Sequence, residues 1–188
     1  MKHQQPIELL LDLRFDTKGI NAFLDKCGYW NSHTERTVTY SPHREVSDIY
    51  ARYGDISTAD VRRNDKAFPM FWYFRDLQQL LEPACDILMN RVNGVELGGV
   101  LITKIPPGGK VYRHRDYGWH ASTFSKYLIC AKADMQQAFC FDGQELRTDD
   151  GAVFWFDNSN EHWVTNDSQR ERISIICCIR TPQGIHKP

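Results

Sequence analysis

The 188-residue chain lacks several features that would place it in a large class of proteins. It has no excess of charge, because 23 Lys and Arg oppose 24 Asp and Glu and leave a net charge of -1, which argues against nucleic acid as a partner. It has no run of about 20 apolar residues that could span a bilayer, and its first residues do not read as a signal peptide. We therefore expect a cytoplasmic protein with no membrane or nucleic-acid partner.

Cysteine pairs at metal-binding spacing are also missing. The six cysteines are scattered and none forms a Cys-x-x-Cys pair, so neither a zinc knuckle nor a secreted disulfide framework is indicated. Several lie in apolar, strand-like runs, where a free cysteine behaves as a small hydrophobic residue. The length suits a single domain with one core and one active site.

The first 97 residues are expected to form a helical support region that begins with a strand. Apolar and polar side chains alternate over residues 7–15, with Leu11 among the apolar set, which predicts a half-buried strand. A Pro at position 83 predicts a kink or a restart in the last helix. Apolar residues at helical spacing predict helices over 20–27, 46–53 and 77–88.

The pattern of residue types changes at Gly98. From there to residue 182, short β-branched and aromatic runs alternate with turn clusters rich in Pro, Gly, Asp and Asn, the pattern of a sandwich or jelly roll. Eight strands make two four-stranded sheets, so residues 98–182 are the expected core of a mainly β (α+β) protein, with N-terminal helices packed against it. The strands are predicted near 98–105, 110–114, 125–131, 137–141, 144–148, 152–156, 162–166 and 171–180.

Three residues of this core have the side chains of a metal site. His114 and Asp116 are two apart at the end of a predicted strand, so both side chains project to one side, and His162 follows a turn where a neighbouring strand begins. Two imidazoles and a carboxylate leave three coordination positions open, as in non-haem iron(II) oxygenases. A lone His-x-Asp is common by chance, however, and a single histidine after a turn is often an ordinary surface residue.

Arg172 strengthens this interpretation. It begins an apolar strand, and Arg172 and Ser174 share one face, so a guanidinium and a hydroxyl could grip a carboxylate together. A buried arginine without an anionic partner costs several kcal/mol, so an inward-pointing Arg172 implies an anion. The alternative is an arginine at the exposed start of its strand.

At these residues the sequence resembles the aspartyl/asparaginyl β-hydroxylase-like branch of the 2-oxoglutarate oxygenases, over roughly residues 98–182. The resemblance implies a double-stranded β-helix (jelly-roll or cupin-like), with Fe(II) held by His114 and His162 and 2-oxoglutarate bound by Arg172. Branch members that act on epidermal-growth-factor-like domains look like two-histidine enzymes, whereas this chain has Asp116 in the usual oxygenase position. The matching positions are Pro107-Gly108, Val111, His114, Gly151, Phe156-Asp157, Ser159, Glu161-His162, Val164 and Arg172.

Three further residues are candidates for the site. The family often has a second basic residue that contacts 2-oxoglutarate, and Lys126 is the nearest match, unless its side chain points outward into water. Trp119 and His120 follow Asp116 in the chain and could bind substrate, although packing within the loop would explain them as well.

The expected function is that of an Fe(II)- and 2-oxoglutarate-dependent dioxygenase. Such an enzyme uses O2 to hydroxylate an unactivated C–H bond of an amino acid, a peptide or a small metabolite, and converts 2-oxoglutarate to succinate. The alternatives are a cupin-like protein that binds a divalent metal without 2-oxoglutarate, and an interaction module without metal. Arg172 and Ser174 discriminate, because a simple metal store has no need of a carboxylate clamp.

Overall fold

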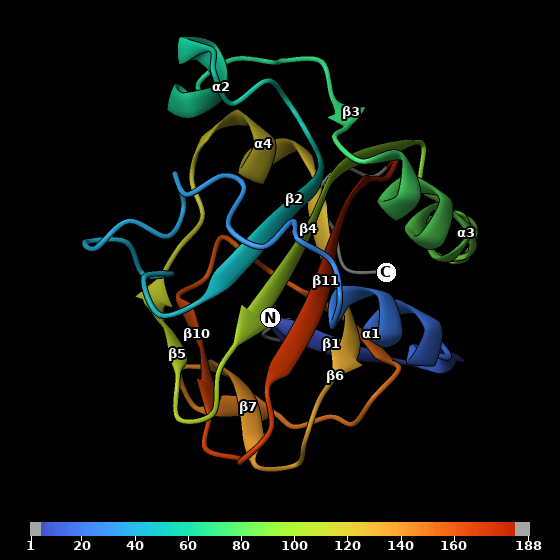
Figure 1. The fold of residues 1–188 in the computed structure, drawn as a ribbon, viewed down its shortest axis with the longest axis vertical. Coiled ribbons are helices and arrows are strands. Elements are labelled where there is room, and N and C mark those ends of the chain that lie inside the picture. The colour runs from blue at the N-terminus through green and yellow to red at the C-terminus, as the bar shows by residue number, and fades with distance from the viewer. Residues whose placement is uncertain (1–4, 183–188) are drawn as a thin grey trace.

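Two antiparallel β-sheets packed face to face form the centre of the molecule (Figure 1). The structure is a computed structural model and describes residues 5–182. The large sheet contains, in spatial order, β1 (Ile7–Arg14), β9 (Ala152–Phe156), β6 (Ser125–Lys132), β11 (Arg172–Arg180), β4 (Glu96–Ile105), β2 (Ser47–Tyr53) and β3 (Phe71–Trp72). The small sheet contains β5 (Lys110–His114), β10 (His162–Asn166), β7 (Gln137–Phe141) and β8 (Gln144–Leu146).

The expected jelly roll is confirmed, with one difference in the sheets. The eight strands predicted after residue 98 divide into two sets of four, as expected. The large sheet is wider than four strands because β1 pairs with β9 on one side, and β2 pairs with β4 and carries β3 on the other. The first 97 residues therefore supply strands as well as helices.

The predicted helix over residues 46–53 is wrong, because this segment is strand β2. Four consecutive residues, Asp48 to Ala51, are buried, since β2 lies between β4 and β3 and is covered on both faces. A strand buried on both faces loses its alternating pattern. Its apolar positions then fit helical spacing by coincidence.

The predicted strand at residues 7–15 is confirmed as β1, but its buried face is not the expected one throughout. Leu10 is buried and Leu11 is 87% exposed, because the pairing with β9 shifts register between Leu9 and Arg14. An irregularity of this kind exchanges the two faces of a strand, which alternation in the sequence cannot reveal.

Two helices cover the outer face of the large sheet, so the molecule has three layers. α1 (Lys18–Leu24) and α3 (Arg75–Arg91) pack their apolar residues against the inner strands β4, β6 and β11. The expected restart of the last helix at Pro83 does not occur. Pro83 and Gln79, whose carbonyl loses its helical partner, both lie on the exposed side of α3, where water can hydrogen-bond to that carbonyl.

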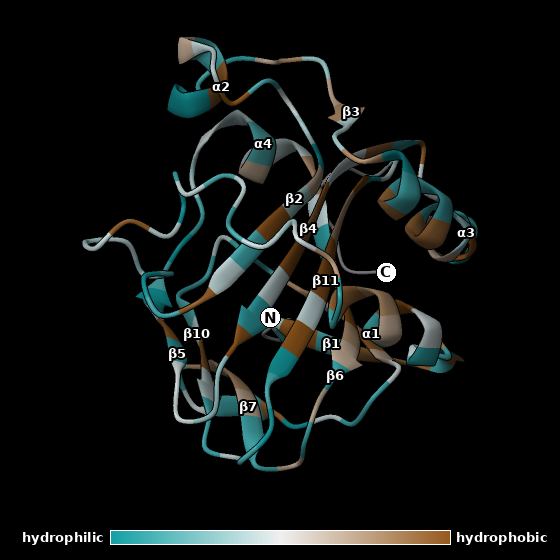
Figure 2. Ribbon diagram, in the orientation of Figure 1, coloured by the Kyte–Doolittle hydropathy of each residue, from teal (hydrophilic) through white to brown (hydrophobic). Residues whose placement is uncertain are grey.

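Apolar residues concentrate on the central strands, and hydrophilic ones on the outer loops and on α2 (Ala59–Arg63) (Figure 2). No helix within residues 5–182 is both long and apolar enough to cross a membrane. All six cysteines are free and five of them are buried, in agreement with their expected role as small hydrophobic residues.

Candidate active site

His114, Asp116 and His162 lie together at one end of the small sheet. His114 is the last residue of β5 and His162 is the first of β10, and the two are paired in the antiparallel register. Asp116 follows two residues after His114. Its Oδ1 lies 3.6 Å from His114 Nε2 and its Oδ2 lies 4.0 Å from His162 Nε2. One ligand atom from each residue falls within 4.8 Å of the others, a spacing at which the three could hold one metal ion.

Backbone hydrogen bonds orient both imidazoles toward that point. Nδ1 of His114 lies 2.8 Å from the carbonyl of Tyr112, and Nδ1 of His162 lies 2.9 Å from the carbonyl of Asn160. A carbonyl only accepts, so each Nδ1 carries the proton and donates it, which leaves the lone pair of each Nε2 free for a metal. Burial lowers the pKa of His114 and lowers the pKa of His162 to about 4, so both rings are neutral at pH 7.

Asp116 is ionised in spite of its surroundings. Burial acts to raise the pKa of this carboxyl, but the charge of the neighbouring Lys126 ammonium and its hydrogen bond act against burial, and the pKa lies well below its ordinary value. Lys126 forms an ion pair with Asp116 Oδ2, and its side chain is only 16% exposed. Lys126 therefore points into the site and not into water. The three candidate ligands thus present two neutral nitrogens and one anionic oxygen.

Arg172 lies in the same cavity as these three residues and is buried. It is 1% exposed, and among residues 5–182 no group accepts a hydrogen bond from its Nη1 or Nη2. Ser174 is also buried and faces the same space. We call this space the inner pocket; its walls include Leu128, Phe139, Val164, Arg172 and Ser174, with His114, Asp116 and His162 at one end. A guanidinium buried without a partner is costly, so the inner pocket is suited to an anion.

A second cavity, the mouth pocket, adjoins the first. Its walls include Ser41, Tyr50, Tyr53, Arg115 and Cys178, and it shares His114, Asp116 and Lys126 with the inner pocket. The two pockets follow one another along strand β11. Arg172 and Ser174 line only the inner pocket, Ile176 lines both pockets, and Cys178 lines only the mouth pocket. The candidate metal site therefore lies between a buried anion pocket and a more open one.

The two predicted substrate residues differ in their positions. His120 lies on α4 (Gly118–Thr123), lines the mouth pocket, and accepts a hydrogen bond at Nε2 from the backbone N–H of Gly99 at 3.2 Å. Trp119 lines neither pocket and packs its ring against Phe68 and Phe124.

Two residues that sequence analysis did not identify, Arg36 and His43, line both pockets. His43 is 6% exposed, and its ring lies edge-on to that of His114 with 4.6 Å between centroids. Both belong to the segment between α1 and β2, which is polar and has no periodic pattern. Nothing in its sequence indicates that it returns to the metal site.

Sequence comparison identifies a related family. A sequence model of the family described as aspartyl/asparaginyl beta-hydroxylase matches residues 44–182, which is most of the chain. The streptomycin biosynthesis protein StrG of Streptomyces griseus is 26% identical over an alignment of 128 residues, and the alignment covers 61% of this chain. The match spans 64% of the length of that relative.

Two solved structures share the fold over nearly the whole chain. One is an oxidoreductase of the 2OG-Fe(II) oxygenase family from Burkholderia pseudomallei, with a TM-score of 0.63 and 11% identity over 97% of this chain and 89% of that one. Another is the viral collagen prolyl hydroxylase vCPH from Paramecium Bursaria Chlorella virus-1, with a TM-score of 0.56 and 10% identity over 94% and 96% of the two chains. At these identities the likeness is one of fold.

Proposed function

The chain belongs to the aspartyl/asparaginyl beta-hydroxylase family, and on that basis we propose that it is an Fe(II)- and 2-oxoglutarate-dependent oxygenase. The proposed reaction hydroxylates an unactivated C–H bond of an amino acid, a peptide or a small metabolite, consumes O2, and converts 2-oxoglutarate to succinate and carbon dioxide. The observation that carries the proposal is the inner pocket, where a buried guanidinium, whose Nη1 and Nη2 have no hydrogen-bond partner within residues 5–182, faces the same space as two imidazoles and a carboxylate.

Each residue has a distinct role in this proposal. His114, Asp116 and His162 hold Fe(II) through Nε2, a carboxylate oxygen and Nε2. Arg172 and Ser174 bind the distal carboxylate of 2-oxoglutarate, because a guanidinium and a hydroxyl together satisfy several of its lone pairs. When bound, Fe(II) with 2-oxoglutarate supplies the oxidising chemistry. The chain itself supplies geometry and charge.

Lys126 is proposed as a second cation for the co-substrate. Its ammonium group lies at Asp116 and lines both pockets, so it is within the region where the two ends of a short dicarboxylate would be placed. Apolar side chains of both sheets, including Leu128, Phe139 and Val164, enclose the inner pocket and exclude bulk water from it. Ionic contacts are stronger in such surroundings than in water.

We also propose that the enzyme acts in the cytoplasm on a small-molecule or peptide substrate. Six free thiols support a reducing compartment, since disulfides form and persist mainly in oxidising ones. The mouth pocket, which opens beside the three proposed ligands, is the proposed substrate site.

An anaerobic titration with Fe(II) and 2-oxoglutarate tests the proposed function. A keto acid bound to Fe(II) through two oxygens gives a visible charge-transfer band, which we expect for the wild type. The band should need far more 2-oxoglutarate in Arg172→Ala. It should be unchanged in Arg180→Ala, which removes an arginine with a 43% exposed side chain at the other end of the same strand. Binding of Fe(II) without any band on addition of 2-oxoglutarate would favour the cupin-like alternative.

A further inference from the structure

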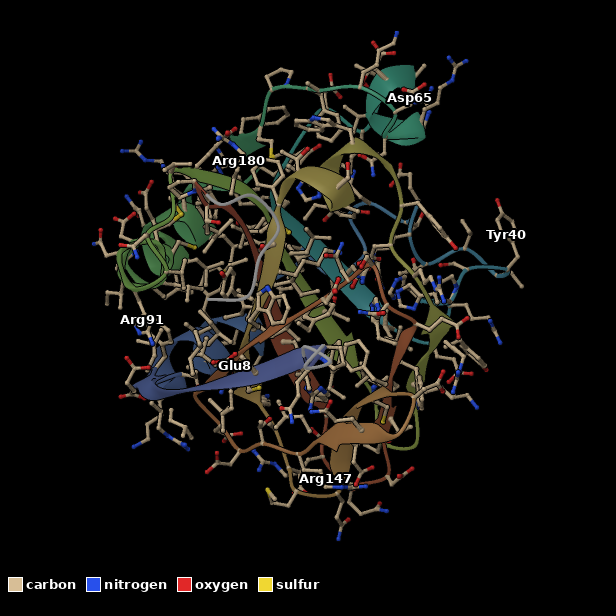
Figure 3. The ribbon with its side chains drawn as sticks, turned by 180° about the vertical axis from the view of Figure 1, so that it is seen from behind. Glu8, Tyr40, Asp65, Arg91, Arg147 and Arg180 are labelled. Carbon is tan, nitrogen blue, oxygen red and sulfur yellow. The ribbon has the colours of Figure 1, made fainter. Side chains whose placement is uncertain are left out.

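One wall of the mouth pocket comes from a segment outside the part of the chain that matches the family. Residues 44–182 match, whereas Arg36, Ser41, Pro42 and His43 precede them and line the mouth pocket. Figure 1 shows this segment as a long loop beside β2 and β5, and Tyr40 near its tip points away from the molecule in Figure 3. The segment therefore adds groups of this chain's own to the site.

Arg36 is the charged group of that segment at the site. Its side chain is 21% exposed, and its Nη1 donates to Asp48 Oδ2 at 2.7 Å and to Thr103 Oγ1 at 3.1 Å. Asp48 is fully buried and in turn accepts a hydrogen bond from Thr103 at 2.7 Å. The carboxylate and the hydroxyl hold the guanidinium from one side, which fixes its direction at little further loss of side-chain entropy on binding.

The rest of the guanidinium is available to a ligand. Arginine has five N–H donors, and within residues 5–182 the hydrogen bonds of the Arg36 side chain are those made by Nη1. Thr103, which holds Nη1, is paired with Ser174 across the sheet, so Arg36 lies next to the row that lines the inner pocket. Arg36 lines both pockets, so its side chain borders the space that a substrate must occupy.

The charges around the mouth favour an anion. Three cationic side chains line it, those of Arg36, Arg115 and Lys126, against one anionic side chain, Asp116. Asp116 is paired with Lys126 and is the proposed metal ligand. Arg115 is exposed, and no hydrogen bond or ion pair of its side chain occurs within residues 5–182. Arg36 is paired with Asp48, which does not line the mouth, so Arg115 is the cation of the mouth without an ionic partner within residues 5–182, and Arg36 contributes its remaining N–H donors.

We infer that the substrate carries a carboxylate or phosphoryl group, which Arg36 binds in the mouth pocket while the C–H bond to be hydroxylated lies at the metal. This inference rests on the proposed function and names a substrate class for it. Arg36 is the specificity-determining residue, Asp48 and Thr103 position it, and Arg115 adds positive charge at the rim.

Calorimetric titration of small probes into the protein saturated with Fe(II) and 2-oxoglutarate under argon tests the inference. The probes are methyl phosphate, acetate and acetamide, the last being a neutral analogue of acetate. We expect at least one of the two anions to bind at least about tenfold more tightly than acetamide, as a charge-assisted contact implies. The two anionic probes distinguish a phosphoryl substrate from a carboxylate one.

Matched variants distinguish the contribution of Arg36 to anion binding from that of its neighbours. Arg36→Gln combined with Asp48→Asn removes both charges of the ion pair, so no unpaired carboxylate is left. This double variant should lower the affinity for the anion that the wild type binds by about tenfold or more. Arg36→Lys, which keeps the charge without the planar fork, should weaken it less. Arg44→Gln is the control, because Arg44 directly follows His43 in the chain but lies over the Tyr112 ring and lines neither pocket, and it should leave the affinity unchanged.

Different failures point to different errors. If the charge-transfer band forms but acetamide binds as well as the anions, or the double variant keeps its anion affinity, the inference is overturned and the proposed function stands. Loss of the band in the double variant would assign Arg36 to 2-oxoglutarate and also overturn the inference. If the wild type never forms the band, the proposed function fails and the inference fails with it.

Discussion

A single residue, Arg172, shows the conflict between stability and binding at this site. It is among the largest fully buried side chains of the protein, and burial lowers its pKa, so the folded state carries a charged group away from water. No carboxylate within residues 5–182 forms an ion pair with it. Such a group destabilises the unliganded fold, and a bound dicarboxylate would remove the penalty.

Arg172→Met should therefore stabilise the protein while it weakens 2-oxoglutarate binding. Methionine keeps an unbranched apolar stem, although a shorter one, and removes the charge, so we expect the free energy of unfolding without ligand to rise by about 1 kcal/mol or more. Affinity for 2-oxoglutarate should fall by roughly 10- to 150-fold, the equivalent of about 1.5–3 kcal/mol. Urea unfolding and the anaerobic titration measure the two effects. Arg180→Met, at an exposed ion pair with Glu96, should change neither by much. A destabilised Arg172→Met would mean that Arg172 has a structural role.

Asp116→Ala tests the carboxylate of the proposed triad. It removes the one anionic ligand and leaves the Lys126 ammonium without its partner, so we expect Fe(II) affinity and succinate formation to fall by at least about 100-fold. Asp142→Ala is a suitable control, because Asp142 is an exposed residue paired with Arg113 and should leave both unchanged. Undiminished succinate formation by Asp116→Ala would exclude Asp116 as a ligand.

The elements of the second half could be predicted from sequence because turn signals separate them. Gly108, Gly143 and Gly151 have positive φ angles, at 72°, 75° and 84°, and each stands in a turn before or between strands that the sequence predicted. His114 and Asp116 follow from that pattern through two-residue periodicity, and the antiparallel pairing of β5 with β10 brings His162 to them. Arg36 and His43 do not follow from it. Their segment has no period, and a tertiary contact with β2 and β4 determines its path.

Helix α4 provides a prediction about pH, through His120. Burial, with a smaller effect from Lys126, lowers the pKa of His120 from an ordinary 6.5 to about 3. The unfolded chain thus takes up this proton near pH 6.5 and the folded chain only near pH 3, so the stability that the neutral ring provides is complete above pH 6.5 and declines as the pH falls toward 3.

His120→Gln should reduce that acid sensitivity. An amide oxygen can still accept the hydrogen bond from Gly99 N–H, but it does not titrate. Between pH 7 and pH 4.5, we expect the wild type to lose about 2 kcal/mol more unfolding free energy than the variant, as measured by urea unfolding. The other buried histidines titrate alike in both proteins and cancel in the comparison. Equal losses would show that the ring of His120 is protonated without cost in the folded state.

At the scale of the whole molecule, residues 5–97 and the β core share one sheet and one hydrophobic core, so we expect them to unfold as one cooperative unit. β1 and β2 extend the large sheet beyond β9 and β4, and α1 and α3 cover its outer face. The second half contains the three proposed ligands and Arg172, but the first half supplies Arg36 and His43 and buries the strand, β11, on which Arg172 lies.

A fragment of residues 98–182 should therefore not fold by itself, although it contains every strand of the predicted jelly roll. Leu77, Leu81 and Leu88 of α3 are fully buried against the large sheet. At roughly 1.5–3 kcal/mol for each leucine, their loss alone is comparable to the net stability of a domain, about 5–15 kcal/mol. The fragment would also expose the backbone of β4 and β9 where β2 and β1 normally pair, which favours aggregation. Thermal unfolding of the fragment, followed by circular dichroism and compared with that of the full chain, should show no cooperative transition. A sharp transition of the fragment would show that residues 98–182 are an autonomous domain and that the first 97 residues are not needed for it to fold.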